Sequence, residues 1–351
     1  MLLVIFGAGA SFDSVHHLPP PRPHEARKFH EEFRPPLANQ LFEDRPDFVA
    51  AMQRFPDCMD LVPILRRRGA AIEKELARLQ AEAPQYPRRD QQLAAIRYYL
   101  HFMLWECQQK WRDDWHKGIT NYRTLLDEIE RLRRQTNEPV LFVTFNYDTM
   151  LENAMLETVG FNVEDIDTYV QRSDYILIKL HGSVNWGREI DGIEGVSGPL
   201  DSRKLGYQGL INAGNKLRVS DRFTLVSHRP MVINERAALV FPALAIPVEN
   251  KDEFSCPDRH VHMLETLLRE VTHIATIGWR ATEVDFLAML KEKLINYPKI
   301  MIVSGDDKGA TETFDNITKY ATQIDKSSVR VTGGFTGLIE DLGFLRILLG
   351  K

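Results

Sequence analysis

The residues Leu2-Leu3-Val4-Ile5-Phe6-Gly7-Ala8-Gly9-Ala10-Ser11 give the strongest indication of the fold. The first five are all apolar, which is typical of a buried strand, and the glycines that follow favour a tight turn. In an open α/β sheet, a turn of this kind at the carboxyl end of a strand is where phosphates and dinucleotides bind. The usual dinucleotide fingerprint has a third glycine where this chain has Phe12. Residues 7–11 are therefore a candidate phosphate-binding turn, and a plain strand-to-loop turn is the alternative.

Composition narrows the class of protein. The chain has 351 residues, of which 44% are hydrophobic, so it can bury a sizeable core. Its formal net charge of -5 argues against a general membrane or nucleic-acid binder. Three widely spaced cysteines exclude a disulfide framework and a four-cysteine zinc site. We expect a cytoplasmic protein that has no membrane span and does not bind nucleic acid directly.

Strand and helix patterns alternate over much of the chain. Apolar runs predict strands at 2–6, 140–144, 175–179, 273–277, 299–303 and 328–331. Helix patterns cover about 148–157, 258–271, 282–294, 308–320 and 335–349. Strands that alternate with helices favour a mainly parallel sheet with helices on both faces. The expected fold is therefore α/β, with a Rossmann-like doubly wound sheet.

Two segments interrupt this alternation. Residues 24–136 carry repeated helix-period patterns and no convincing strand, so we expect a large helical insertion after the first strand. Residues 187–236 begin with a stretch rich in Gly, Asp, Ser and Asn and carry only short apolar runs, which indicates a long loop or a small subdomain. Residues 1–351 are expected to form a single domain that contains both segments.

Small or polar residues follow four of the later strands, as they follow the first. They are Thr144, Asn146 and Asp148 after 140–144; His181, Gly182 and Ser183 after 175–179; Gly278, Trp279 and Arg280 after 273–277; and Asp306 after 299–303. Because ligands of an open α/β sheet bind outside the carboxyl ends of its strands, these residues are expected to share one site with residues 7–11.

Three of these segments resemble the sirtuin family. They are GAGAS (7–11), the T-x-N-x-D of 144–148 and the His-Gly of 181–182, which occur in sirtuin order and are followed later by Gly278-Trp279. The pattern is similar to the sirtuin-like effectors of bacterial antiphage defence. The resemblance implies that NAD is bound and consumed as a substrate. It also implies assembly into a homo-oligomer or with a regulatory or ATPase partner protein.

We assign expected roles in NAD cleavage to these residues. His181 would act as the base, and Asn146 would hold the ribose hydroxyls and the attacking water. Asp148 suits a helix N-cap, and the resemblance gives it the nicotinamide carboxamide as well. Thr144 would orient the loop that carries Asn146. The pyrophosphate is expected to bind the backbone amides of Gly7, Ala8, Gly9, Ala10 and Ser11 and the Ser11 hydroxyl, and the nicotinamide is expected near Asp13. The remaining expected binding residues are Gly182 and Ser183 of the His-Gly-Ser segment; Gly278, Trp279 and Arg280 along the diphosphate and adenosine; and Asp306 at the adenosine ribose.

The expected function is that of an NAD glycohydrolase, which releases nicotinamide and ADP-ribose and so depletes NAD during phage infection. No metal is expected, because Cys256, His260 and His262 are only three ligands at unsuitable helical spacing. The alternatives are an NAD-dependent protein deacylase or ADP-ribosyltransferase, and a nucleotide-sensing module without catalysis. The cysteine pairs that bind zinc in deacetylating sirtuins are absent, which disfavours deacylation.

Overall fold

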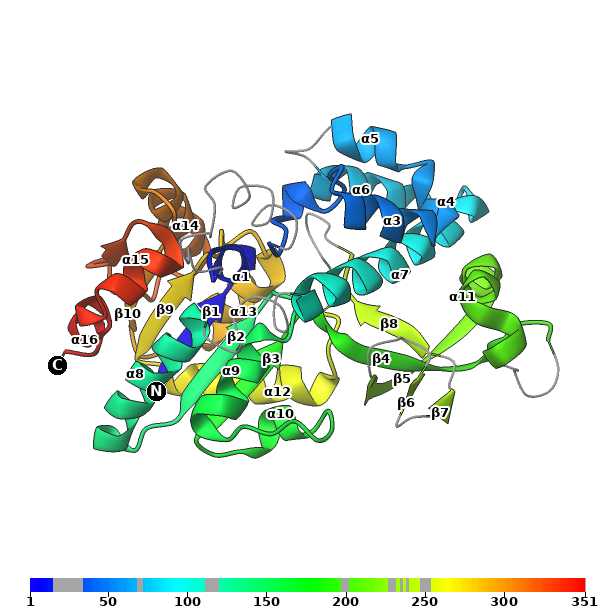
Figure 1. Cartoon of the computed structure of the whole chain (residues 1–351). Coiled ribbons are helices and arrows are strands. Elements are labelled where there is room, and N and C mark those ends of the chain that lie inside the picture. Colours follow the sequence, from blue (N-terminus) through cyan, green and yellow to red (C-terminus); the bar gives the residue numbers. More distant parts are fainter. Residues whose placement is uncertain are drawn as a thin grey trace, which may run out of the picture.

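A six-stranded parallel sheet forms the centre of the molecule (Figure 1). The computed structural model describes residues 1–14, 34–67, 72–110, 120–196, 202–226, 232–233, 236–237, 240–246 and 254–350. The strands are β1 (Leu2–Phe6), β2 (Val140–Thr144), β3 (Tyr175–Lys179), β9 (His273–Ile277), β10 (Lys299–Val303) and β11 (Val329–Val331). Their spatial order is β11-β10-β9-β1-β2-β3, and all neighbours are parallel. The predicted Rossmann-like sheet is confirmed.

Helices cover both faces of this sheet. On one face lie α1 (Ala8–Asp13), α8 (Asn121–Thr136), α9 (Met150–Val159) and α15 (Gly334–Glu340), with α8 contacting α9 and α15. On the other face lie α12 (Asp258–Leu267), α13 (Val284–Lys293) and α14 (Asp307–Tyr320), which contact one another in that order. The chain winds outward from β1 through β2 to β3 and then from β9 through β10 to β11. The winding therefore reverses between β1 and β9, where ligands of doubly wound sheets bind.

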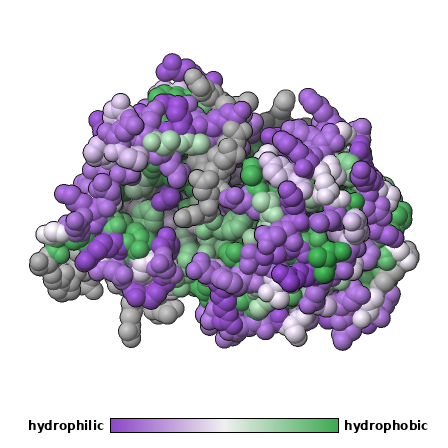
Figure 2. Space-filling view, turned by 180° about the vertical axis from the view of Figure 1, so that it is seen from behind, coloured by the Kyte–Doolittle hydropathy of each residue, from purple (hydrophilic) through white to green (hydrophobic). Residues whose placement is uncertain are grey.

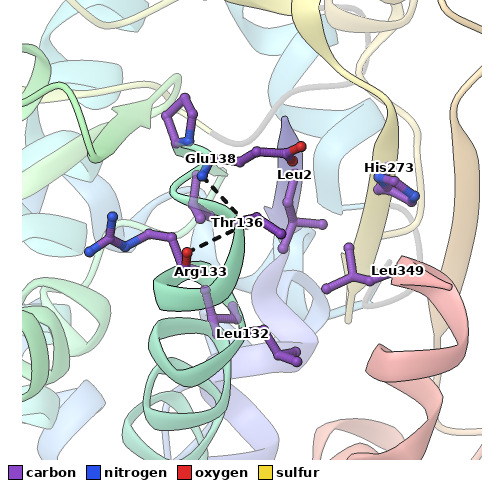
Figure 3. A pocket seen from close by; sticks show the side chains of 10 residues that line it. Leu2, Leu132, Arg133, Thr136, Glu138, His273 and Leu349 are labelled. Atoms are coloured by element: carbon purple, nitrogen blue, oxygen red, sulfur yellow. Dashed lines mark hydrogen bonds between the residues drawn. The ribbon is translucent and has the colours of Figure 1, made fainter. Parts of the chain in front are cut away.

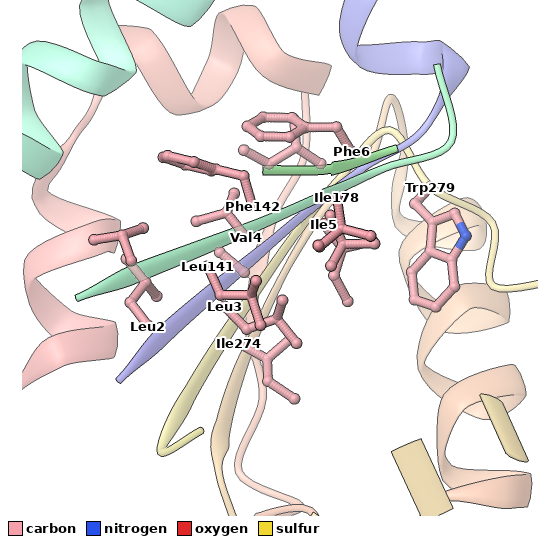
Figure 4. Close-up of a cluster of buried hydrophobic side chains, with 14 of the residues drawn as sticks. Leu2, Leu3, Val4, Ile5, Phe6, Leu141, Phe142, Ile178, Ile274 and Trp279 are labelled. Atoms are coloured by element: carbon pink, nitrogen blue, oxygen red, sulfur yellow. The ribbon is translucent and has the colours of Figure 1, made fainter. Parts of the chain in front are cut away.

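Strand β1 lies at the centre of the hydrophobic core. All five of its residues are buried, and alternate side chains point to opposite faces of the sheet. Leu2, Val4 and Phe6 lie toward one face, and Leu3 and Ile5 lie toward the other (Figure 4). This two-sided burial explains why the strand reads as a continuous apolar run.

The insertion after β1 is helical wherever it is described. Its elements are η1 (Ala38–Gln40), α3 (Pro46–Gln53), α4 (Pro56–Met59), α5 (Val62–Arg67), α6 (Ile72–Glu82) and α7 (Pro87–Lys110), and it is followed by α8. Residues 24–33, 68–71 and 111–119 of the predicted insertion lie outside the described residues. The long helix α7 buries residues around much of its circumference, because it packs against other helices on one side and against a second sheet on the other.

That second sheet lies where the sequence showed only weak periodicity. Strands β5 (Leu217–Leu225), β4 (Gly182–Ile193) and β8 (Val240–Leu244) form an antiparallel sheet in that order. The same region contains α11 (Ser202–Ala213), η4 (Gly214–Lys216) and the short strands β6 (Val232–Ile233) and β7 (Arg236–Ala237). The described parts of residues 187–236 thus form strands and a helix, where the sequence predicts a long loop or a small subdomain. Bulges in β4 and charged cross-strand pairs such as Arg222–Glu189 obscure the alternation of hydrophobic and polar residues that would predict strands here.

The insertion and the second sheet share a hydrophobic core. Residues of α3 to α7 pack with Val184 and Leu244 of β4 and β8 and with Leu210 of α11. Figure 1 shows this second lobe beside the parallel sheet, and Figure 2 shows, from behind, hydrophobic residues gathered in a hollow of an otherwise mainly hydrophilic surface. The site described below lies at the carboxyl ends of β1, β2 and β3, beside the point where β3 passes into β4 of the second lobe.

The last predicted helix is two helices in the structure. The helix expected at 335–349 is divided into α15 and α16 (Gly343–Leu349), because Asp341 Oδ1 accepts a hydrogen bond from the Gly343 amide and turns the chain. Among the described residues, no helix is long and apolar enough to cross a membrane.

Candidate functional site

The glycine turn after β1 packs its backbone directly against the loop after β9. The amides of Gly7 and Gly9 donate to the carbonyls of Ile277 and Gly278 at 3.0 and 3.1 Å, and the Ala10 amide donates to Gly7 at 2.9 Å. A Cβ on Gly278, whose φ is +60°, would lie 2.3 Å from the Ala10 nitrogen. The expectation that the amides of Gly7, Gly9 and Ala10 are free for a pyrophosphate is therefore wrong, because they already bond within the protein.

Ser11, Tyr122 and Asn146 form a triangle of hydrogen bonds beside this turn. Asn146 Nδ2 donates to Ser11 Oγ at 3.0 Å and to Tyr122 Oη at 3.2 Å, and the two hydroxyl oxygens lie 2.9 Å apart. The Asn146 amide donates to Thr144 Oγ1 at 3.0 Å, so Thr144 holds the loop that carries Asn146. All four residues are buried.

The triangle leaves hydrogen-bonding capacity unused. Asn146 Oδ1 is buried and has no hydrogen-bond partner among the described residues. Each hydroxyl of the triangle carries one proton, and the bond between Ser11 and Tyr122 uses only one of the two. A buried polar atom without a partner costs about 1–3 kcal/mol, so we expect a water molecule or a polar ligand group to pair with it. The site therefore offers an acceptor next to a hydroxyl donor.

Sequence reasoning missed Tyr122. It lies in the first turn of α8, at the end of the segment taken as an insertion, and its hydrophobic neighbours Leu125, Leu126 and Ile129 give the segment an ordinary amphipathic pattern. Burial raises the pKa of Tyr122 well above its usual value, so the hydroxyl keeps its proton. Only its place in the first turn of a helix that precedes the Asn146 strand could have drawn attention to it.

His181 lies on the other side of the same loop, against an aromatic group. The ring of Phe145 meets the His181 ring edge to face at 4.8 Å, and the Tyr147 ring lies at 6.2 Å. Trp279 stacks on Phe145 at 5.4 Å between ring centres. The structure thus brings His181 and Trp279 together through Phe145, whereas Asn146, between Phe145 and Tyr147, contacts Ser11 and Tyr122.

Gly182 and Ser183 begin strand β4 directly after His181. Gly182 has φ +79°, and a Cβ there would lie 1.8 Å from the Ala243 carbonyl oxygen, so this position requires glycine. The Ser183 hydroxyl lies 3.2 Å from the Tyr147 carbonyl, and the Val184 amide donates to the same carbonyl at 2.8 Å. These bonds tie the His181 segment to the Asn146 segment.

Asp148 turns the chain into α9. Its Oδ1 accepts a hydrogen bond from the Met150 amide at 3.0 Å, whereas the N-cap residue of the helix is Thr149. The Asp148 carbonyl accepts a hydrogen bond from the Lys179 ammonium group. The sequence placed the cap one residue too early because Asp is the more familiar capping residue in the pair Asp148-Thr149.

Two predicted contact residues have structural partners, and a third has an exposed side chain. Asp13 Oδ2 accepts a hydrogen bond from the Thr336 amide in the first turn of α15 at 2.7 Å, so it faces that helix. Asp306 is the N-cap of α14, where its Oδ1 accepts from the Gly309 amide at 2.7 Å. Arg280 is exposed, and its carbonyl accepts from Asn316 at 3.0 Å.

In the described part of the chain, no group of three or more His, Cys, Asp or Glu side chains could hold a metal ion. Cys256 is buried, while His260 Nε2 bonds to the Ile166 carbonyl and His262 Nδ1 to the Asp258 carbonyl. These three residues therefore have separate structural surroundings.

A small cavity of about 100 Å³ lies at the opposite edge of the sheet (Figure 3). Leu2, Val140 and His273, which begin their strands, line it together with Leu349. The polar side chains around it are mostly engaged, as where Thr136 bonds to the Arg133 carbonyl and to the Glu138 amide. Nothing in this cavity resembles the unpaired acceptor of Asn146. We therefore place the candidate site at the carboxyl edge of the sheet, beside Asn146, and not in this cavity.

Among known proteins, this chain is similar only to solved structures, and the sequence identities are low. A structure described as a Sir2 homologue–NAD complex has 13% sequence identity, with 99% of this chain and 89% of that chain covered and a TM-score of 0.43. A mutant Sir2 homologue in complex with ADP-ribose has 13% identity, 99% and 92% coverage and a TM-score of 0.42. A Sir2 protein bound to a myristoylated histone peptide has 11% identity, 99% and 92% coverage and a TM-score of 0.37. No family model matches the chain. No curated protein matches it either.

Proposed function

We propose that this chain is an NAD glycohydrolase. The observation that carries the proposal is the buried, unpartnered Oδ1 of Asn146, held by Ser11 and Tyr122 at the carboxyl edge of the sheet where the winding reverses. An acceptor beside a hydroxyl donor complements a ribose hydroxyl or a water molecule. The sirtuin-like order of the GAGAS, T-x-N-x-D and His-Gly segments supports NAD as the molecule that supplies the ribose.

The chemistry suits a site with few charged groups. Nicotinamide is a cationic ring in NAD and leaves as a neutral one, so the leaving group needs no proton from an acid. The bond between the ribose carbon and the nicotinamide nitrogen breaks, and the oxygen of a water molecule bonds to that carbon. Asn146 orients the water or the ribose hydroxyls, and His181 takes the proton that the water loses. The products are nicotinamide, ADP-ribose and one proton.

The biological role that we propose is depletion of NAD during phage infection. The support is the resemblance of the motifs to antiphage effectors, and such a role requires control of the activity. We propose that the protein assembles with itself or with a regulatory or ATPase partner, and the surface of the helical lobe is available for that contact. Loss of NAD and growth arrest in phage-infected cells that express the protein, both absent with His181→Ala, would support this role. Infected cells that keep full NAD levels would oppose it.

Product analysis tests the activity. The purified protein is incubated with NAD, with and without an acetylated peptide, and nicotinamide, ADP-ribose, cyclic ADP-ribose and acetyl-ADP-ribose are separated. We expect nicotinamide and ADP-ribose in equal amounts without peptide, reduced about 100-fold or more in His181→Ala. Peptide-dependent acetyl-ADP-ribose would assign a deacylase instead. Binding of NAD without turnover, alone or in a cell extract from infected cells, would assign a sensor.

A further inference from the structure

Lys179 and Glu152 form an ion pair inside the protein. Lys179 Nζ lies 2.9 Å from Glu152 Oε1, and the two side chains expose 0% and 7% of their surface. Lysine is almost never fully buried unless it is paired. A buried pair of this kind is weak evidence for stability, since well-packed apolar residues often serve as well or better. Its presence two residues before His181 calls for another reason.

The pair is connected to the Asn146 loop. Lys179 also donates to the carbonyl of Asp148, two residues after Asn146, so one ammonium group bridges the loop after β2 and helix α9. Glu152 Oε1 accepts a second hydrogen bond from the Tyr169 hydroxyl at 3.1 Å. Burial and the Glu152 charge raise the pKa of Tyr169 well above its usual value, so this hydroxyl remains a donor.

The hydrogen bonds then return to the same loop from the other side. Asn185 Nδ2 donates to the Tyr169 hydroxyl at 3.3 Å, and Asn185 Oδ1 lies 2.6 Å from Ser183 Oγ. Ser183 Oγ in turn lies 3.2 Å from the Tyr147 carbonyl. The chain of bonds thus runs from Asp148 to Tyr147 of the same loop. It includes Ser183 and Asn185 at the start of β4, which follows His181.

We propose that Lys179 and Glu152 are positioning residues, which fix the segment that carries Asn146 against the segment that carries His181. This inference rests on the proposed NAD glycohydrolase function. Neither residue needs to touch the substrate. Their effect is on the alignment of two groups that act on one ribose, and displacement of such a group by about 1 Å can lower a rate about 100-fold.

The test uses a double variant, Lys179→Met with Glu152→Met, which removes both charges and keeps side-chain volume. Pairs replaced in this way commonly keep or gain stability, so the protein is expected to fold. We expect kcat for NAD to fall about 10- to 100-fold, with KM within about threefold of the unmodified protein. Glu152→Gln, which keeps an oxygen acceptor for Lys179 and Tyr169, should recover much of kcat.

A matched control lies at the other end of strand β3. There Glu130 pairs with Arg133 and accepts from Tyr175, the first residue of the strand, just as Glu152 pairs with Lys179 and accepts from Tyr169. Glu130→Met with Arg133→Met should leave kcat unchanged. Equal loss of kcat in both double variants, or a folded Lys179/Glu152 double variant with kcat within twofold, would overturn the proposal.

Amide hydrogen exchange gives a second readout that does not depend on activity. In the Lys179/Glu152 double variant, exchange should rise in peptides that contain residues 145–149 and 181–185 and stay unchanged in α13. Unchanged exchange at 145–149 would overturn the positioning role even if the protein turns over no NAD. Raised exchange in a protein without any NAD turnover would leave the positioning role intact and reject the proposed function.

Discussion

At the amino edge of the sheet, Glu130 accepts hydrogen bonds from both Arg133 and Tyr175, whereas at the carboxyl edge Asn146 keeps a buried carbonyl oxygen with no partner among the described residues. Both edges are built from the same six strands, so the difference does not come from the fold. Natural proteins pair nearly all buried polar atoms because an unpaired one is destabilising. The Asn146 edge is therefore the one where we expect a ligand, because the polar residues after the parallel strands also lie there.

Substitution of Gly278 should give the largest effect on folding. An alanine there would keep φ at +60° and place its Cβ against the backbone of Gly9 and Ala10, so we expect Gly278→Ala to lose roughly 3 kcal/mol or more of unfolding free energy. Gly160→Ala is the control, because Gly160 has φ +62° in open space and ends α9; it should lose only about 1 kcal/mol. Urea denaturation measures both, and equal losses would contradict the close packing of the two turns.

Removal of one tyrosine hydroxyl should lower the activity at the carboxyl edge of the sheet but not at the amino edge. Tyr122→Phe deletes one corner of the triangle around Asn146, and we expect kcat for NAD to fall about tenfold with a stability loss of about 1 kcal/mol. Tyr175→Phe removes a hydroxyl that bonds to Glu130 at the amino edge and should cost similar stability without a change in kcat. A tenfold loss in both variants would mean that the Tyr122 effect is general destabilisation.

The smallest expected effect is a pH dependence at the amino edge. The hydrogen bond from Arg133 lowers the pKa of Glu130 from 4.5 to about 2. A carboxyl group with a lowered pKa in the folded state stabilises the protein above its unfolded pKa, and this contribution disappears as pH falls from about 4.5 toward 2. The stability difference between the unmodified protein and Glu130→Gln should therefore shrink over that interval. We expect it to be modest, because the arginine partners are partly solvated. A difference that is constant from pH 6 to 3 would contradict the assignment.

Much of the parallel sheet could be predicted from the sequence. Strands buried on both faces read as unbroken apolar runs, and the residues directly after them are placed by topology at one edge. The sequence therefore predicts Ser11, Thr144, Asn146 and His181 near one another, and each of them contacts or belongs to the segment 144–146.

Other features depend on contacts that the local sequence does not record. Tyr122 reaches Asn146 only because α8 packs beside α9 and α15 on one face of the sheet, and its helix pattern looks ordinary. The amides of Gly7 and Gly9 were expected to be free, but the β9 loop approaches so closely that it takes them as donors. Strand β4 was hidden by bulges and exposed charged residues, and its packing with α7 joins segments that are far apart in the chain.

The most direct test of the account is the turnover of NAD by Asn146→Ala. We predict that kcat falls about 100-fold or more, as when a group that orients the reacting atoms is removed. The loss of two hydrogen bonds should lower the unfolding free energy by only about 1–2 kcal/mol. The account would be contradicted by an Asn146→Ala protein that releases nicotinamide from NAD within twofold of the unmodified rate.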